Sequence, residues 1–191
     1  MMPVRVFAAL LVALCLGPAA WAPAWADEPR ITRIEPAVRN GGLEIDADVD
    51  ITLNDQLREA AQRGVSLYFT ADLVIERERW WWFDSTVVET TLTWHVAYNA
   101  LTRQWRVGTG RLSLPVASLD EAMSQVRRIR GWRVADSSVF ERDTRYDGRL
   151  RVRLDTSQLA RPFQVNALNS SSWSLATPWA QFSFAVSEAR Q

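Results

Sequence analysis

The sequence predicts a mainly β protein: an antiparallel β-sandwich, loosely immunoglobulin-like, with about seven or eight strands and two short helices. Most of the chain after residue 26 alternates apolar and polar residues, which is typical of half-buried strands. Turn signals separate these runs, and only two segments have the end signals and periodicity of helices. A partly open β-barrel is the alternative architecture.

The first 26 residues have the pattern of a secretory signal peptide. Arg5 precedes an unbroken apolar run over residues 6–16, and Ala24, Trp25 and Ala26 form a small-x-small cleavage site. We therefore expect export to the periplasm, cleavage after Ala26 and a single domain over residues 27–191. The apolar run is shorter than the roughly 20 residues of a membrane span. An uncleaved signal anchor in the inner membrane is therefore only the alternative.

The composition argues against several classes of function. The single cysteine, Cys15, lies in the signal segment, so the exported chain can form neither disulfides nor a cysteine metal site. The sequence has 22 basic and 22 acidic residues, without the positive excess typical of nucleic-acid binding. We expect no nucleic-acid partner, no cofactor and no transmembrane span in the mature chain.

The first half of the domain reads as a hairpin, a helix and a meander. Residues 30–39 run into the turn at Asn40, and the next strand alternates an apolar and an acidic face. The apolar face comprises Leu43, Ile45, Ala47, Val49 and Ile51. Asn54 and Gly64 have the pattern of a helix N-cap and C-terminal stop. Three long strands follow, over residues 65–83, 86–99 and 103–112.

The second helix has the clearest end signals. Ser118 and Glu121 fit a capping box, and Gly131 is the expected stop, with Arg127, Arg128 and Arg130 in the last turns. After it, residues 148–155 alternate buried and arginine positions. The apolar positions there are Leu150, Val152 and Leu154. A last strand spans residues 179–186.

We expect no enzymatic activity, because the sequence contains no recognisable catalytic constellation. His95 is the only histidine, and alternation places it on the outer face of a strand beside Thr91 and Thr93. No nucleophile motif supplies a serine partner. The alternatives are a hydrolase built from carboxylates and arginines, and a structural protein of the envelope.

The acidic stripe on the second strand is the one candidate metal site. Oxygen ligands suit calcium, but strand residues two apart lie about 6–7 Å from each other and form a line instead of a cage. The weak calcium candidates are Glu44, Asp46, Asp48 and Asp50. We expect this stripe to pair instead with arginines of a neighbouring strand, namely Arg149, Arg151 and Arg153.

Three consecutive tryptophans follow a run of alternating charge at residues 76–79. Alternation would place Arg77 on the core side, where an unpaired arginine is costly. The strand therefore either runs past the sandwich or contains a bulge. The indoles cap the sandwich with cation–π contacts, bind a protein partner or anchor the protein at a membrane interface. The partner-binding candidates are Arg77, Arg79, Trp80, Trp81, Trp82 and Asp84.

Five segments resemble a proteobacterial envelope family, the domain of unknown function 4390. They are GVSLYFTADLVIERERWWWFD, VAYNALTRQWRV, SLDEAM, LRVRLDTSQLARPFQ and SSWSLATPW. The resemblance carries over no catalytic residues. Members of this family are often encoded beside a membrane sensor kinase of the nitrogen-regulation type. The resemblance therefore implies that this protein is a periplasmic accessory to such a kinase. We therefore expect a non-enzymatic periplasmic binding or interaction protein with an envelope protein as partner.

Overall fold

The computed structural model describes residues 28–77, 85–161, 163–164 and 170–186. Its strands are β1 (Arg30–Arg39), β2 (Gly42–Asp50), β3 (Leu67–Arg77), β4 (Ser85–Asn99), β5 (Gln104–Thr109), β6 (Leu114–Val116), β7 (Arg128–Asp136), β8 (Arg145–Leu154) and β9 (Ala180–Ala185). Its helices are α2 (Asp55–Gln62) and α3 (Leu119–Arg127), with short 3-10 turns η1 (Ser137–Val139), η2 (Thr156–Gln158) and η3 (Ser171–Trp173).

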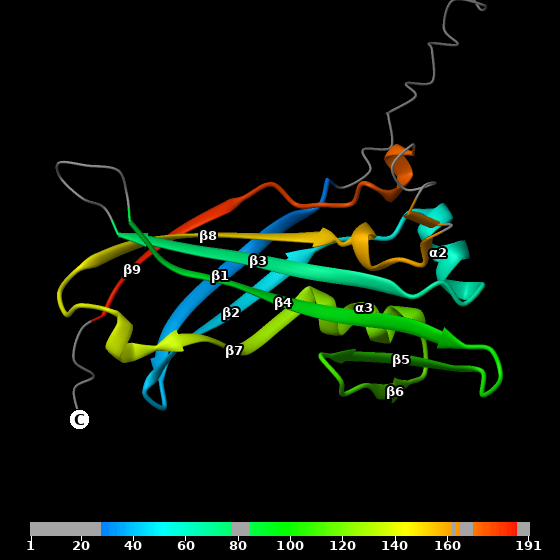
Figure 1. The fold of residues 1–191 in the computed structure, drawn as a ribbon, viewed down its shortest axis with the longest axis horizontal. Helices are drawn as coiled ribbons and strands as arrows, with labels where there is room; N and C mark the ends of the chain where they lie inside the picture. The colour runs from blue at the N-terminus through cyan, green and yellow to red at the C-terminus, as the bar shows by residue number, and fades with distance from the viewer. Residues whose placement is uncertain (1–27, 78–84, 162, 165–169, 187–191) are drawn as a thin grey trace, which may run out of the picture.

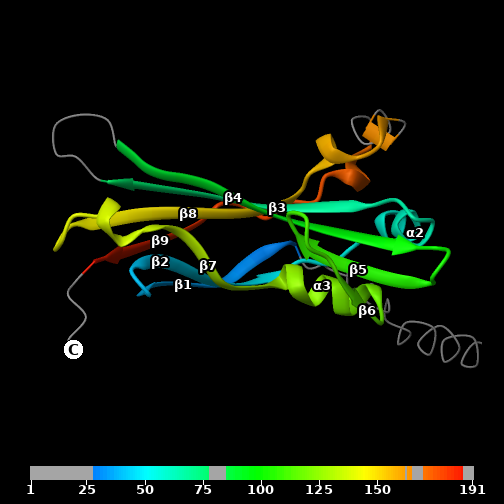
Figure 2. The same cartoon turned by 60° about the horizontal axis from the view of Figure 1, so that its bottom comes forward.

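The strands form two antiparallel sheets, which confirms the predicted sandwich (Figure 1). One sheet has the order β1-β2-β7, and the other has the order β6-β5-β4-β3-β8-β9. Figure 2 shows β1 and β2 as a layer beneath β3 and β8. The order β5-β4-β3 is the predicted meander, whereas β6 and β7 are strands that the sequence pattern did not predict.

The core lies between the two sheets, as the alternating pattern of β2 and β3 predicted. The apolar residues of β2 are all buried, and so are the inward residues of β3, namely Leu67, Phe69, Ala71, Leu73 and Ile75. The β1–β2 turn has the two left-handed residues that such hairpins require, Asn40 at φ 49° and Gly41 at φ 71°. Burial of these apolar faces is the main force that holds the sheets together.

Helix α2 begins and ends where its capping residues predicted. The Asn54 side-chain oxygen accepts the Leu57 backbone N–H at 2.9 Å, and Gly64, at φ 90°, follows the last turn. Leu57 and Ala61 are fully buried, and the opposite face of the helix is exposed. In Figure 1 the helix lies at the end of the larger sheet where β3 begins.

Helix α3 begins at the predicted cap but ends earlier than predicted. The Ser118 hydroxyl accepts the Glu121 N–H at 3.1 Å. The predicted helix end at Gly131 is wrong, because the helix stops at Arg127 and the chain continues directly as β7. Pairing with β2, which places Ile129 opposite Ala47, overrides the local helix signals. Gly131, at φ 58°, lies in this irregularly registered strand instead of capping a helix.

Candidate functional site

The predicted tryptophan edge falls mostly outside the described residues. Arg79, Trp80, Trp81, Trp82 and Asp84 all lie there, and Arg77 is the one partner-binding candidate that the structure describes. The side chain of Arg77 forms an ion pair with Glu141. The β3–β4 register shifts between Ile75 and Glu76 because β4 has one extra residue there, Val87, whereas the β3–β8 register is regular through Arg77. The described part of β3 therefore shows no bulge of its own, and the residues that follow Arg77 lie outside the described part.

The acidic stripe of β2 pairs with arginines, but not with the predicted ones. The prediction was wrong because β2 and β8 belong to different sheets. Asp46 instead accepts the Gly131 backbone N–H at 2.6 Å and contacts Arg39 at 3.1 Å, and Asp48 pairs with Arg130. The Gly131 hydrogen bond is the largest cause that lowers the pKa of Asp46. The other pairs are Arg39–Glu44, Arg33–Asp48 and Arg30–Asp50.

The described residues contain no group of three or more acidic, histidine or cysteine side chains that could hold a metal ion. In β2, the carboxylates of the calcium candidates Glu44, Asp46, Asp48 and Asp50 each face an arginine. The stripe therefore joins β2 to β1 and β7.

The arginines of β8 form a paired charged surface, which we call the β8 face. It comprises Arg149, Arg151 and Arg153 of β8, Asp72 and Glu76 of β3, Asp155 and Trp179. Arg151 and Arg153 both contact the Asp72 carboxylate, at 2.7 and 2.9 Å. The hydrogen bond that Arg153 donates to Asp72 is the largest cause that raises the pKa of Arg153 above its usual value. Each charge on this face has an opposite charge beside it.

An indole covers the β8 face. The guanidinium carbons of Arg151 and Arg149 lie 4.5 and 5.4 Å from the centre of the Trp179 ring, within cation–π distance. Backbone bonds hold the preceding segment on β8, since the Thr177 N–H donates to the Val152 carbonyl at 2.8 Å. The face is therefore a fixed, internally satisfied layer on the outer side of the sheet.

His95 lies on the same outer side of the larger sheet, as alternation predicted. Its ring is 5.0 Å from the ring of Tyr68, and burial lowers its pKa. In the described part of the chain no serine or carboxylate hydrogen-bonds to it. The neighbouring Thr70 and Thr93 hydroxyls bond to each other at 3.0 Å.

Unlike the β8 face, a second region of the molecule is concave. It opens between the two sheets, and we call it the β7 cleft. Its volume is about 510 Å³. It is lined by Leu92 and Trp94 of β4, Thr109 of β5, Ser124 and Gln125 of α3, and Arg128, Ile129, Arg130, Gly131, Trp132 and Arg133 of β7. Trp94 and Trp132 are 6% and 8% exposed and supply an aromatic wall.

The described lining of the β7 cleft contains three arginines and no carboxylate. Arg130 is paired with Asp48, and Arg133 with Asp136, but neither acid lines the cleft. Arg128 is exposed, and its side chain has no ion pair or hydrogen bond within the part of the chain that the structure describes. Counting described residues alone, the cleft has one guanidinium without an ion pair, that of Arg128, beside two that are paired.

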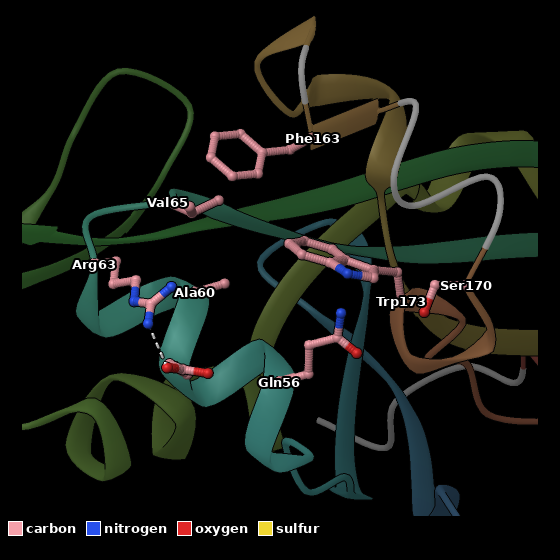
Figure 3. A pocket seen from close by; sticks show the side chains of 8 residues that line it. Gln56, Ala60, Arg63, Val65, Phe163, Ser170 and Trp173 are labelled. Atoms are coloured by element: carbon pink, nitrogen blue, oxygen red, sulfur yellow. Dashed lines mark hydrogen bonds and ion pairs between the residues drawn. The ribbon is translucent and has the colours of Figure 1, made fainter.

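A second concave site lies beside α2, and we call it the α2 cleft (Figure 3). Its volume is about 610 Å³. It is lined by Gln56, Glu59, Ala60 and Arg63 of α2, and by Val65, Phe163, Ser170 and Trp173. Asn54 joins its two walls, because the side chain that caps α2 also donates from Nδ2 to the Ser172 carbonyl at 2.7 Å.

Sequence reasoning missed the residues that shape these clefts. The sequence pattern placed Arg128 in the last turn of the second helix and Trp132 just after its end, whereas both lie in β7. Trp173 lies in a segment without helical or strand periodicity. The only available signal was composition, because residues 127–133 include four arginines and a tryptophan.

The fold and the clefts define the class of protein: a two-sheet β-sandwich with open, concave surface sites. The chain belongs to the family described as "Domain of unknown function (DUF4390)", whose model matches residues 26–183. This confirms the resemblance seen in the sequence. Comparisons with curated proteins and with solved structures gave no match. No helix among the described residues is long and apolar enough to cross a membrane.

Proposed function

We propose that this protein is an exported, non-enzymatic interaction protein of the cell envelope, and that its β7 cleft binds an extended acidic segment of a partner protein. One observation carries the proposal: guanidinium groups surround an aromatic cleft whose described lining contains no acidic residue. The signal-peptide pattern of the first 26 residues supports export. The membrane sensor kinase implied by the family resemblance is the first partner to examine.

The charges of the cleft favour an acidic partner. An incoming carboxylate near Arg128 meets a cation without an ion pair to any described residue, so its desolvation is offset without breaking such a pair. Arg130 and Arg133 keep their own acids, so Arg128 is the guanidinium that an incoming acid meets. Arginine and tryptophan are also the residue types that contribute most to protein interfaces.

The position of β7 favours an extended partner. Within the described strands, β7 pairs with β2 alone, so no described strand pairs with its other edge, and residues of β7 line the cleft. A peptide strand can pair with such an edge through main-chain hydrogen bonds. The alternating side chains of that strand would then face the indoles of Trp94 and Trp132 on one side and water on the other.

A photo-crosslinking amino acid at Gln125 tests the proposal, because this exposed residue of α3 lines the cleft. We expect a crosslink in membranes of the host, mapped by mass spectrometry to an acid-rich segment of one envelope protein. Arg128→Glu should abolish the crosslink, whereas Arg103→Glu should not. Arg103 is an equally exposed arginine, in the turn between β4 and β5, without a charged partner among the described residues.

Reversal of charge on the partner gives the decisive result. Changing the mapped acidic residues to arginine should restore binding to the Arg128→Glu protein, and added salt should weaken the native complex. If Arg128→Glu and Arg103→Glu reduce the crosslink equally, the effect is one of net charge and the cleft is not the site. A crosslink to a segment without acids would also contradict the proposal.

A further inference from the structure

We infer that the α2 cleft is a separate binding site for a small, uncharged amphipathic molecule that presents a carbonyl oxygen to the indole N–H of Trp173. This site is independent of the β7 cleft and of the proposed protein partner. It shares none of its lining residues with the β7 cleft. Its volume of about 610 Å³ is in the range of pockets that hold small molecules.

The indole of Trp173 is the polar group that points to a ligand. The residue is 4% exposed, and its Nε1 is the one buried side-chain nitrogen or oxygen without a hydrogen-bond partner among the described residues. Folded proteins rarely leave a buried donor unpaired, because its lost hydration is not replaced. The orphaned donor therefore marks a place where an acceptor fits.

The way to this donor passes the side chain of Gln56. Figure 3 shows Gln56 extending from α2 toward the indole of Trp173, although no hydrogen bond joins the two. Gln56 is exposed, so rotation of its side chain about its own bonds requires no repacking of the core. Once it turns aside, a ligand oxygen can reach Nε1 while the Gln56 amide supplies a second donor.

The remaining lining sets the chemical class of the ligand. Glu59 and Arg63 already neutralise each other at 2.6 Å, so the cleft offers no net charge to an ion. Val65 and Phe163 are half-buried apolar surfaces, and they pack against the core. A neutral carbonyl compound with a short apolar chain matches this combination of a single donor and apolar walls.

A neighbouring hollow gives the apolar chain further room. It has a volume of about 430 Å³ and shares Arg63, Val65 and Phe163 with the α2 cleft. Its additional lining includes Tyr68 and Leu159. A chain that passes Phe163 would therefore continue along protein surface instead of entering water.

Indole ¹H–¹⁵N resonances of the ¹⁵N-tryptophan-labelled full chain test the inference. The Trp173 signal is identified as the one missing from Trp173→Phe. Hexanamide is the probe, and hexylamine, which at neutral pH is an ammonium ion with the chain but no acceptor, is its control. We expect hexanamide to shift the Trp173 proton downfield with saturation, and hexylamine to leave it unmoved. Trp173→Phe should weaken hexanamide binding about fivefold to tenfold, the effect of one neutral hydrogen bond.

A second variant protects the test from misfolding of Trp173→Phe. Ala60→Leu fills the cleft and retains the indole, and it should abolish the shift. Arg58→Leu adds the same side chain to α2 at a residue that does not line the cleft, and it should retain the shift. The inference fails if hexanamide leaves the Trp173 signal unmoved, or moves it equally in Ala60→Leu. It also fails if Gln56→Leu alone moves the signal upfield, because Gln56 would then be its partner.

Discussion

The β8 face and the β7 cleft use the same side chain in opposite ways. On the β8 face Arg151 and Arg153 share the carboxylate of Asp72, which is only 15% exposed, and Trp179 covers them. In the β7 cleft Arg128 is exposed and makes no ion pair with any described residue. Arginine-rich surface therefore cannot be assigned to binding by composition alone.

The difference lies in whether the charges are already satisfied. Paired guanidiniums over a partly buried acid stabilise the sheet, and a ligand would have to break those pairs to bind there. An unpaired guanidinium costs little while it remains in water and can pair with an incoming acid. The two regions should consequently respond in opposite ways to substitution, one in the free energy of unfolding and the other in binding.

The largest expected effect is the loss of stability on Asp72→Ala. The substitution leaves two arginines without their shared acid, and removal of one member of a fully buried pair costs about 3–5 kcal/mol. The side chains of Arg151 and Arg153 keep 34% and 32% of their surface exposed, so water screens part of this cost. We expect a loss of about 2 kcal/mol in urea denaturation.

Two variants sharpen this prediction. Asp72→Asn keeps one acceptor oxygen and should recover part of the lost stability. Asp147→Ala removes a more exposed acid, 50% exposed and 3.7 Å from Arg145, and should cost at most about 0.5 kcal/mol. If Asp72→Ala costs no more than Asp147→Ala, the β8 face does not stabilise the fold.

A smaller loss is expected for Trp179→Ala. The indole covers Arg151 and Arg149, and an exposed cation–π contact contributes about 0.5–1 kcal/mol. Urea denaturation should show that Trp179→Ala lowers the free energy of unfolding by about 1 kcal/mol, and that Trp179→Phe lowers it by roughly half as much. Leu112→Ala, at a residue 81% exposed, is the matched control and should be neutral. Equal effects at both positions would contradict a role for the ring.

The sequence predicted those parts of the fold that depend on local pattern. The faces of β2 and β3 follow from alternation, because successive side chains in a strand point to opposite sides. Asn54 and Ser118 cap their helices because a side-chain oxygen next to a helix start has orphan N–H donors within reach. The end of α3 was mispredicted, since it depends on the pairing of Ile129 with Ala47, a residue 82 positions earlier in the chain.

The candidate sites could not be predicted for a related reason. The partner of the β8 arginines is set by strand order, and a sign of it was present in the outward acids of β3, Asp72 and Glu76. The β7 cleft requires α3, β4 and β7 to meet, which no spacing along the chain encodes. The buried donor of Trp173 lies on η3, which a hydrogen bond from Asn54 joins to α2 across 118 positions of the chain.

A pH-dependent effect, smaller again, is expected at His95. Burial lowers its pKa, so the unfolded chain binds the proton more readily than the folded one. The contribution of neutral His95 to the free energy of unfolding is then complete above the histidine pKa of the unfolded chain, near 6.5. It declines as the pH falls toward the lower pKa of the folded protein. Urea denaturation at pH 7.5 and 5.5 should show this decline in the native protein and a smaller one in His95→Gln. Identical pH profiles would contradict the prediction.

The smallest expected change in stability, and the sharpest contrast with Asp72, is that of Arg128→Glu. Its exposed side chain makes no described ion pair, so urea denaturation should show a change within about 0.5 kcal/mol of the native protein.

Arg130→Gln tests the same cleft at a paired position. It removes the contacts to Asp48 and to the Ala47 carbonyl, and it should destabilise the protein more than Arg128→Glu does. A full-chain Arg128→Glu protein that unfolds as readily as Asp72→Ala would show that Arg128 is structural, and the distinction between the β8 face and the β7 cleft would then be lost. A stable variant that no longer captures an acidic partner segment would establish that distinction, because fold and binding would have been separated at a single residue.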